Sequence, residues 1–175
     1  MIISESFPIK SSRLTLKLFL EENITTEYSS WLNNPKVVKY SNQRFKEHNY
    51  DSSICYFKSF FQTNNLFLVI MLDKEMIGTM TSYINKEHQT ADIGIMLSPD
   101  FWNQGFASEA MLILMEHLFS FNIRKIAGGT LSCNSAMIRV FENAGMKIEC
   151  IRKKQEIFEN KEVDIICFCK FKDES

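Results

Sequence analysis

Glycine and proline are scarce in this sequence, with six and three residues among 175, and no repeat, low-complexity tract or linker-like stretch divides it. We therefore expect one domain over residues 1–175, with its core at about 8–172. The longest apolar run, residues 66–72, falls far short of the ~20 residues that span a bilayer. No basic segment precedes a long apolar one at the N-terminus. These absences predict a cytoplasmic protein with no membrane partner.

An excess of charge of either sign is also absent, since 20 Lys and Arg residues nearly balance 21 Asp and Glu residues. Non-specific nucleic-acid binding needs a basic excess that displaces phosphate counterions. We therefore expect no nucleic-acid partner. The 45% hydrophobic content is sufficient for a buried core.

Paired Cys-x-x-Cys and His-x-x-x-His motifs are missing, although the chain has five cysteines and three histidines. Cys167 and Cys169 share one face of a predicted strand. These two cysteines could have a redox or metal-binding role, or they could simply pack in the core. Free cysteine commonly packs as a small hydrophobic residue. We expect no metal.

Hydrophobic periodicity then predicts the elements. Alternation or apolar runs indicate strands at 13–20, 66–72, 76–84, 90–97, 125–131, 147–155 and 163–171. Helical spacing indicates helices at 24–32, 35–40, 50–61, 107–119 and 135–143. A left-handed cap is expected at Gly145.

The order of these elements predicts an α+β fold with a mixed, mostly antiparallel sheet flanked by helices. Residues 66–97 form an antiparallel meander. The strands at 90–97 and 125–131 are joined by the helix at 107–119, so they should run parallel with a right-handed crossover.

The stretch from Ile93 to Ala110 is the most informative. A strand ends at Ser98-Pro99, and a helix opens near Gly105. Small residues at Gly105 and Ala107 leave backbone N–H groups free to face a ligand, and a helix start favours phosphate. An ordinary strand-to-helix turn explains the same residues, because Gly-x-Ala alone is a weak motif.

Four segments together resemble the GCN5-related N-acetyltransferase (GNAT) superfamily, closest to its ribosomal-protein N-terminal acetyltransferase branch. They are Ser-Ser-Arg-Leu-Thr-Leu-Lys-Leu-Phe with Trp-Leu-Asn-Asn-Pro, Phe-Trp-Asn-Gln-Gly-Phe-Ala-Ser-Glu-Ala, and Asn-Ser-Ala-Met-Ile-Arg-Val-Phe-Glu-Asn-Ala-Gly-Met. The resemblance spans nearly the whole chain. It implies a splayed parallel strand pair that opens into an acetyl-CoA cleft.

The resemblance also implies which residues bind acetyl-CoA. Loop amides should hold the pyrophosphate, and strand backbone groups should pair with the pantetheine arm and polarise the thioester. The expected cofactor-binding residues are Met96, Leu97, Ser98, Asn103, Gln104, Gly105, Phe106, Ala107, Ser108 and Asn134. Trp102 stands where many members have Arg or Gln, and Ala107 replaces the second glycine of the motif.

Asn134 matches the family asparagine that contacts the pantetheine arm or a site water, and it is also a good helix N-cap. The positions at which relatives have a serine or tyrosine near the thiolate hold Met137 and Phe141. The acid that protonates the leaving thiolate is therefore unidentified: Ser135, Cys133 or a water could serve, or the thiolate could leave unassisted.

Transfer to nitrogen requires a neutral amine, and we expect Asp92 to act as a base or water relay. Strand alternation places Asp92, Gly94 and Met96 on one face. A solvated surface position would explain Asp92 equally well. Glu109 lies in the first helical turn, where a carboxylate is stabilising.

The acceptor should be a protein N-terminal amine or a small-molecule amine, bound beside the cleft by a polar and aromatic cluster. Its expected members are Tyr40, Gln43, Arg44, Phe45 and Tyr83. Arginine there would pair with a carboxylate or phosphate, whereas a plain surface loop would account for the same residues. An amino sugar of surface-polysaccharide synthesis is a second acceptor class. The chain could instead be a non-catalytic CoA-binding sensor or a purely structural domain, and we expect a monomer or homodimer.

Overall fold

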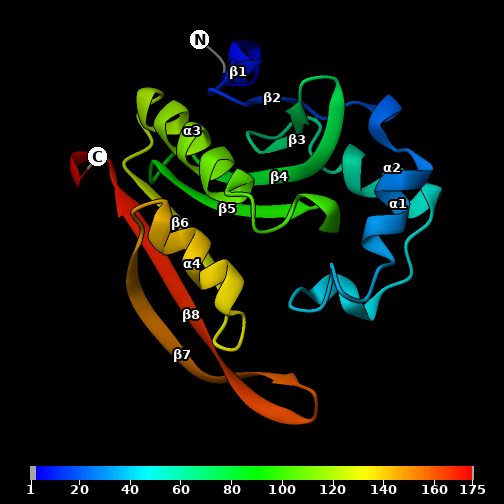
Figure 1. The fold of residues 1–175 in the computed structure, drawn as a ribbon. Helices are drawn as coiled ribbons and strands as arrows, with labels where there is room; N and C mark the ends of the chain where they lie inside the picture. Colours follow the sequence, from blue (N-terminus) through cyan, green and yellow to red (C-terminus); the bar gives the residue numbers. More distant parts are fainter. Residues whose placement is uncertain (1–2, 175) are drawn as a thin grey trace.

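The computed structural model describes residues 3–174, which form an eight-stranded sheet with helices on both faces (Figure 1). The strand order is β1-β2-β3-β4-β5-β6-β8-β7. The strands are β1 (Ile9–Lys10), β2 (Leu14–Leu18), β3 (Leu66–Leu72), β4 (Glu75–Asn85), β5 (Thr90–Leu97), β6 (Lys125–Leu131), β7 (Lys147–Phe158) and β8 (Lys161–Phe171). The helices are α1 (Thr26–Leu32), α2 (Tyr50–Lys58), α3 (Phe106–Ser120) and α4 (Ser135–Asn143), with short 3-10 turns at Ile3–Ser6, Glu21–Asn23, Asn42–Phe45, Pro99–Phe101 and Lys172–Glu174.

Two apolar clusters pack on opposite faces of the sheet. One is centred on α3, whose Ala110, Met111 and Leu114 are fully buried against β2–β6. The other is aromatic and lies under α1 and α2, where Phe19 stacks on Phe67 with ring centroids 4.0 Å apart. Burial of large side chains on both faces explains why β3 is one continuous apolar run.

The predicted α+β fold class is confirmed. Strands β3, β4 and β5 form the antiparallel meander, and β5 and β6 are the parallel pair joined through α3. Gly145 has the expected left-handed conformation, with φ of 75°. Within residues 3–174, none of the helices has the length and apolar content to cross a bilayer.

The predicted helix at 35–40 is wrong. These residues form consecutive turns, in which the amides of Val37 and Val38 both donate to the Asn34 carbonyl. The Asn34 side chain accepts from the Lys36 amide at 3.0 Å and so competes with helical bonding. Proline at position 35 and two adjacent valines add little helix propensity, so the turns do not extend into a helix.

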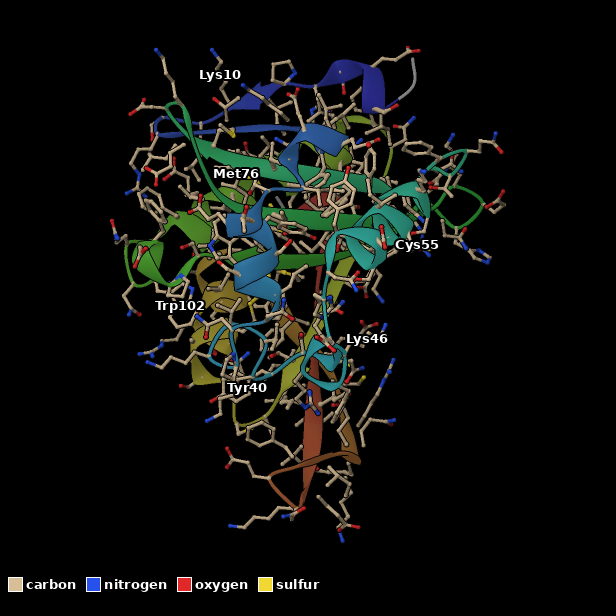
Figure 2. All side chains as sticks on the ribbon, turned by 90° about the vertical axis from the view of Figure 1, so that its right-hand side faces the viewer. Lys10, Tyr40, Lys46, Cys55, Met76 and Trp102 are labelled. Atoms are coloured by element: carbon tan, nitrogen blue, oxygen red, sulfur yellow. The ribbon has the colours of Figure 1, made fainter. Side chains whose placement is uncertain are left out.

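The largest further differences from the predicted boundaries are at the end of α2 and at the tip of the β7–β8 hairpin. Helix α2 ends at Lys58 rather than at residue 61, and Phe60 and Phe61 occupy turns beyond it. Strands β7 and β8 continue to a hairpin tip at Glu159 and Asn160, both with left-handed φ. Positive φ at two central residues suits the twist of a tight hairpin. The long hairpin projects from the body of the protein below α1 and α2 (Figures 1 and 2).

Candidate active site

The parallel strands β5 and β6 separate after only three paired positions. Their pairing ends where Asp92 faces Ala127, while each strand continues for several residues. The vertex of this V is filled from the α4 face by the Phe141 ring. A Cβ at Gly128 would lie 2.7 Å from that ring and 3.2 Å from the Ile93 carbonyl, so the packing requires glycine there.

The backbone N–H and C=O groups of successive β5 residues point alternately toward β4 and toward β6. The Ser98 amide donates to the Ile77 carbonyl, and Met96 lies opposite Thr79 two positions earlier. In an antiparallel ladder this spacing makes Met96 and Thr79 a hydrogen-bonded pair. The backbone groups of Met96 therefore face β4, whereas those of Ile95 and Leu97 face the open side of the V.

The loop before α3 presents a run of free peptide amides. Within residues 3–174, the N–H groups of residues 103–108 have no hydrogen-bond acceptor. Asn103 and Gly105 have left-handed φ values of 59° and 81°, which curve this run of amides. Consecutive amides in such a curve, together with a helix N-terminus, make a site for an anion.

Arg13 ties this loop to the start of β2. Its guanidinium lies 2.6 Å from a Glu109 carboxylate oxygen and donates to the Gln104 carbonyl at 3.2 Å. The same guanidinium lies 4.4 Å from the centre of the Phe106 ring. Sequence reasoning assigned Glu109 to the helix dipole and missed this contact, although Arg13 lies in the N-terminal segment that resembles the family.

The pKa of Glu109 reflects the same contacts. Its partial burial acts to raise the pKa, but hydrogen bonds from Ser11 and Arg13 and the Arg13 charge outweigh that effect. The net result is a pKa below the ordinary value. Glu109 is therefore ionised at neutral pH and keeps Arg13 in place beside the loop.

Trp102 closes the outer end of the V. Its indole N–H donates to the Leu97 carbonyl at 2.9 Å, so it satisfies a backbone group that faces away from β4. The ring remains partly exposed beside the loop (Figure 2). This aromatic residue thus connects β5 to the amide-rich loop.

Asn134 is the N-cap of α4, as expected. Its side-chain oxygen accepts from the Met137 amide at 3.3 Å, and its side-chain nitrogen donates to the Thr130 hydroxyl at 3.0 Å. Both polar ends of the amide are thus engaged at the end of β6. This places Asn134 at the edge of the opening between β5 and β6.

Phe141 and Met137 are packing residues in this fold. Phe141 is 1% exposed and stacks on Phe168 with centroids 4.9 Å apart. Met137 is half-buried against the same core. Neither side chain can donate a proton, so protonation of a leaving group must come from elsewhere.

Asp92 lies at the vertex and lines a cavity of about 560 Å³ on the face opposite α3. The cavity is bounded by β6, β7 and the loop after α1. The walls desolvate Asp92 and raise its pKa, while the nearby Arg152 charge lowers it; the net direction is upward. A carboxylate with a raised pKa is a better proton acceptor than an ordinary one.

The expected acceptor cluster is divided by the structure. Tyr40 lines the cavity with Asp92, whereas Gln43 and Arg44 line a neighbouring one. Tyr83 is directly opposite Asp92 on β4, and its hydroxyl lies 3.0 Å from that of Tyr56. Phe45 is 71% exposed and packs under the Arg44 guanidinium.

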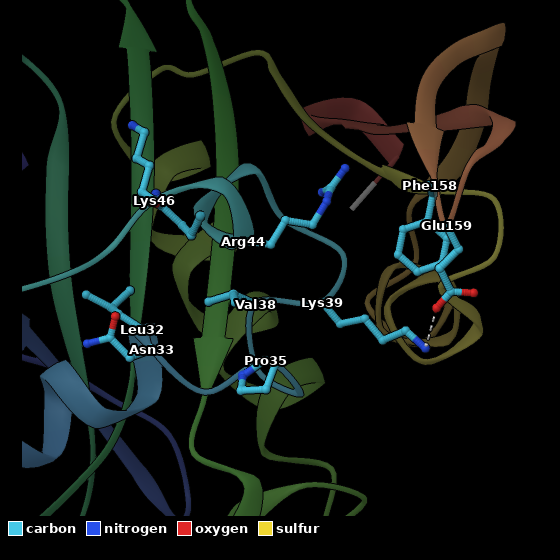
Figure 3. A pocket seen from close by; sticks show the side chains of 10 residues that line it. Leu32, Asn33, Pro35, Val38, Lys39, Arg44, Lys46, Phe158 and Glu159 are labelled. Carbon is cyan, nitrogen blue, oxygen red and sulfur yellow. Dashed lines mark ion pairs between the residues drawn. The ribbon is translucent and has the colours of Figure 1, made fainter.

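The neighbouring cavity, of about 340 Å³, lies between residues 32–46 and the hairpin tip. Lys39 pairs with Glu159 across it at 3.4 Å, as the dashed line in Figure 3 shows. Arg44 pairs with Glu156 at 3.3 Å. The hairpin is thus joined to the loop after α1, and this contact forms the wall between the two cavities.

Comparison with known proteins identifies the fold and the family. The family model described as acetyltransferase (GNAT) domain matches residues 13–147. The chain is 28% identical over 115 residues to the uncharacterized N-acetyltransferase p20 of Bacillus licheniformis, and 32% identical over 90 residues to YnaD of Bacillus subtilis (strain 168). These matches cover 65% and 50% of this chain, and 65% and 53% of the two relatives.

Solved structures share the architecture at low sequence identity. RimL, a ribosomal L7/L12 alpha-N-protein acetyltransferase in complex with coenzyme A, superposes with a TM-score of 0.85 at 18% identity, covering 94% of this chain and 97% of its own. Spermidine N-acetyltransferase from Vibrio cholerae, in complex with CoA and spermine, gives 0.84 at 19% identity, covering 94% and 98%. These likenesses establish the same fold.

Proposed function

This chain belongs to the GNAT family of acetyltransferases, and from that membership we propose that it is an acyltransferase that transfers the acetyl group of acetyl-CoA directly to a primary amine. The observation that supports the donor most strongly is the run of free amides at residues 103–108 beside a V whose backbone edge is open. RimL and the Vibrio enzyme were both solved with CoA.

The residues present fit the donor. No Cβ occupies the space at Gly105, where an added one would meet only the Arg13 guanidinium at 3.5 Å. The amides of residues 103–108 would hold the pyrophosphate, with the Ser108 hydroxyl as a further donor. Backbone groups of Ile95 and the Leu97 amide would pair with the pantetheine arm as an added strand does, in place of Met96, while the Leu97 carbonyl keeps its bond from the Trp102 indole. Asn134 would contact the arm near the end of β6.

Acetyl-CoA supplies an activated thioester; the chain aligns that thioester with the amine and accepts a proton. The acceptor would enter from the cavity lined by Asp92 and Tyr40, on the opposite side of the V from α3. Asp92 would accept the amine proton directly or through a water. Alignment of two bound reactants supplies much of the remaining rate enhancement.

The acceptor is a protein N-terminal amine or a small-molecule amine in this proposal. The structural neighbours act on both types, since RimL acetylates ribosomal protein L7/L12 and the Vibrio enzyme acetylates spermidine. A nucleotide-linked amino sugar is a narrower candidate, motivated by the Trp-Leu-Asn-Asn-Pro segment and the Gln-Arg-Phe that follows. A CoA-binding sensor is the non-catalytic candidate, motivated by Met137 and Phe141.

Calorimetry with CoA and thiol release from acetyl-CoA across an amine panel test the proposal. We expect Gly105→Glu to weaken CoA binding at least ten-fold, about 1.4 kcal/mol, because it brings a carboxylate to the pyrophosphate site. Asn122→Glu is the matched control, since Asn122 also has left-handed φ and lies at the opposite end of α3.

Each competing function has its own outcome. Saturable CoA binding without turnover of any amine would favour the sensor. A melting temperature that CoA leaves unchanged would favour a purely structural domain, because a bound ligand must stabilise the folded state. Equal CoA affinity in wild type and Gly105→Glu would show that the loop does not hold the pyrophosphate.

A further inference from the structure

Three of the five charged side chains that line the 560 Å³ cavity are in ion pairs. The five are Asp92, Lys125, Glu149, Arg152 and Glu156. Lys125 forms an ion pair with Glu149, and Glu156 pairs with Arg44 at 3.3 Å. These pairs neutralise two of the three carboxylates that line the cavity, Glu149 and Glu156. Asp92 and Arg152 are the two charged lining residues that neither pair includes.

Arg152 has no ion-pair or hydrogen-bond partner within residues 3–174, and its side chain is exposed to the cavity. It lies on β7 opposite Ile165, with Cys150 and Cys167 as the next pair on the same face. Its charge reaches Asp92, whose pKa it lowers against the effect of desolvation. A guanidinium without a partner is available to bind carboxylate or phosphate through two parallel hydrogen bonds.

We propose that Arg152 binds an anionic group of the acceptor, a carboxylate or a phosphate, while the acceptor's amine lies beside Asp92. This inference rests on the proposed acetyl transfer and narrows its acceptor to amines that also bear a negative charge. Asp92 and Arg152 thus act on opposite ends of one molecule, the first on the reacting amine and the second on its anion.

The register sets how far apart these two groups lie on the acceptor. Asp92 is opposite Ala127 of β6, whereas Arg152 is level with Leu131 through Ile165 of β8. Four residues of strand span about 13 Å, and the arginine side chain covers part of that distance. An acceptor whose amine and anion are several bonds apart therefore fits better than the α-carboxylate of a free amino acid.

The charge balance of the cavity disfavours a polycation. Its three carboxylates are matched by Lys125, Arg152 and the Arg44 that pairs with Glu156. A polyamine would thus meet no net negative charge and would bring its second ammonium group toward Arg152. Like charges placed together suppress binding of the wrong partner.

Two matched pairs of acceptors test the inference and separate the sources of the anion. One pair is glucosamine 6-phosphate against glucosamine, and the other is a peptide beginning Ser-Asp against one beginning Ser-Asn; spermidine is the polycation. For at least one pair we expect kcat/KM to favour the anionic member at least ten-fold. In Arg152→Gln that preference should fall to below three-fold, because the KM for the anionic member rises more than the KM for the neutral one.

Lys74→Gln is the matched control, because it removes one positive charge from the exposed β3–β4 turn and should keep the full preference. Calorimetric binding of the same pairs to CoA-saturated protein gives a second readout that needs no turnover. Equal binding of the members of both pairs, binding of none of them, or an undiminished preference in Arg152→Gln would overturn the inference. Failure of the proposed function is a separate result: no heat with CoA, or no thiol release with any amine.

Discussion

Truncation of Arg13 tests how the amide-rich loop is held. Arg13→Ala removes the ion pair to Glu109, the hydrogen bond to the Gln104 carbonyl and the contact with the Phe106 ring. The Arg13 side chain is 45% exposed, so solvent screens the ion pair, whereas Glu109 is only 17% exposed. An exposed pair contributes up to ~1 kcal/mol and a ring contact ~0.5–1 kcal/mol.

These terms predict a loss of about 1–2 kcal/mol in the free energy of unfolding. For a chain of this size, the melting temperature should fall by about 2–8 °C. Glu109 keeps the Ser11 hydroxyl at 2.6 Å and the residue 13 amide at 3.1 Å, so its carboxylate is not left without donors. The loss should therefore not reach the several kcal/mol expected of an orphaned buried charge.

The more specific consequence concerns CoA. Because Arg13 contacts the peptide that precedes Gly105, its removal should loosen the curve of amides and weaken CoA binding by about five-fold, or ~1 kcal/mol. Calorimetry measures the affinity, and thermal melts with and without CoA measure the stability. Lys17→Ala, on the exposed side of the same strand, is the control. An unchanged CoA affinity in Arg13→Ala would refute the role of Arg13 as a positioning residue.

Two other variants probe the vertex of the V. Asp92→Asn should lower amine acetylation most at low pH, where the amine is protonated, and leave CoA affinity unchanged; a pH–rate profile identical to wild type would exclude Asp92 as the base. Because the pKa of Asp92 is raised in the folded state, its ionised carboxylate destabilises the fold at pH values above the unfolded-state pKa. The melting temperature of Asp92→Asn should therefore exceed that of wild type at pH 7–8. This difference should fade as the pH falls and the wild-type carboxylate becomes protonated. Tyr83 lies opposite Asp92, and the Arg152 charge acts on its pKa, so both residues should be left unchanged in this variant. Gly128→Ala should destabilise the protein by about 1–3 kcal/mol in urea melts, because its methyl group would overlap the Phe141 ring; an unchanged midpoint would contradict this packing.

Much of the sheet could be predicted because local patterns and global packing agree. Strands at 66–72, 90–97 and 125–131 and the helix at 135–143 have the predicted bounds. Each is an apolar run or a strongly amphipathic segment bounded by clear turn residues. The predicted helix at 35–40 is wrong because a segment this short gains little from helical hydrogen bonding, whereas the Asn34 side chain and Pro35 both favour a turn.

The residues of the proposed cofactor site are easier to find in the sequence than those of the proposed acceptor site. Gly105 and Ala107 are visible in the sequence as small residues at a helix start. The bond between Arg13 and Glu109 joins residues 96 positions apart, and no local pattern reports such a contact. Arg152 lies in a basic, exposed strand of the kind that usually faces only solvent, so its place in the cavity that Asp92 also lines emerges only from the fold.

This asymmetry has a physical cause. In the proposed function, the donor is held mostly by backbone groups, whose positions depend on φ, ψ and strand register more than on side-chain identity. Structures at 17–21% identity can therefore share this fold. In the same proposal, the acceptor is recognised by side chains from three separate segments, which are the loop after α1, strand β5 and the β7–β8 hairpin. A change of charge at Arg152 or Glu149 would therefore alter acceptor choice without disturbing the residues that hold CoA, which is how one fold can serve both a ribosomal protein and a polyamine as acceptors.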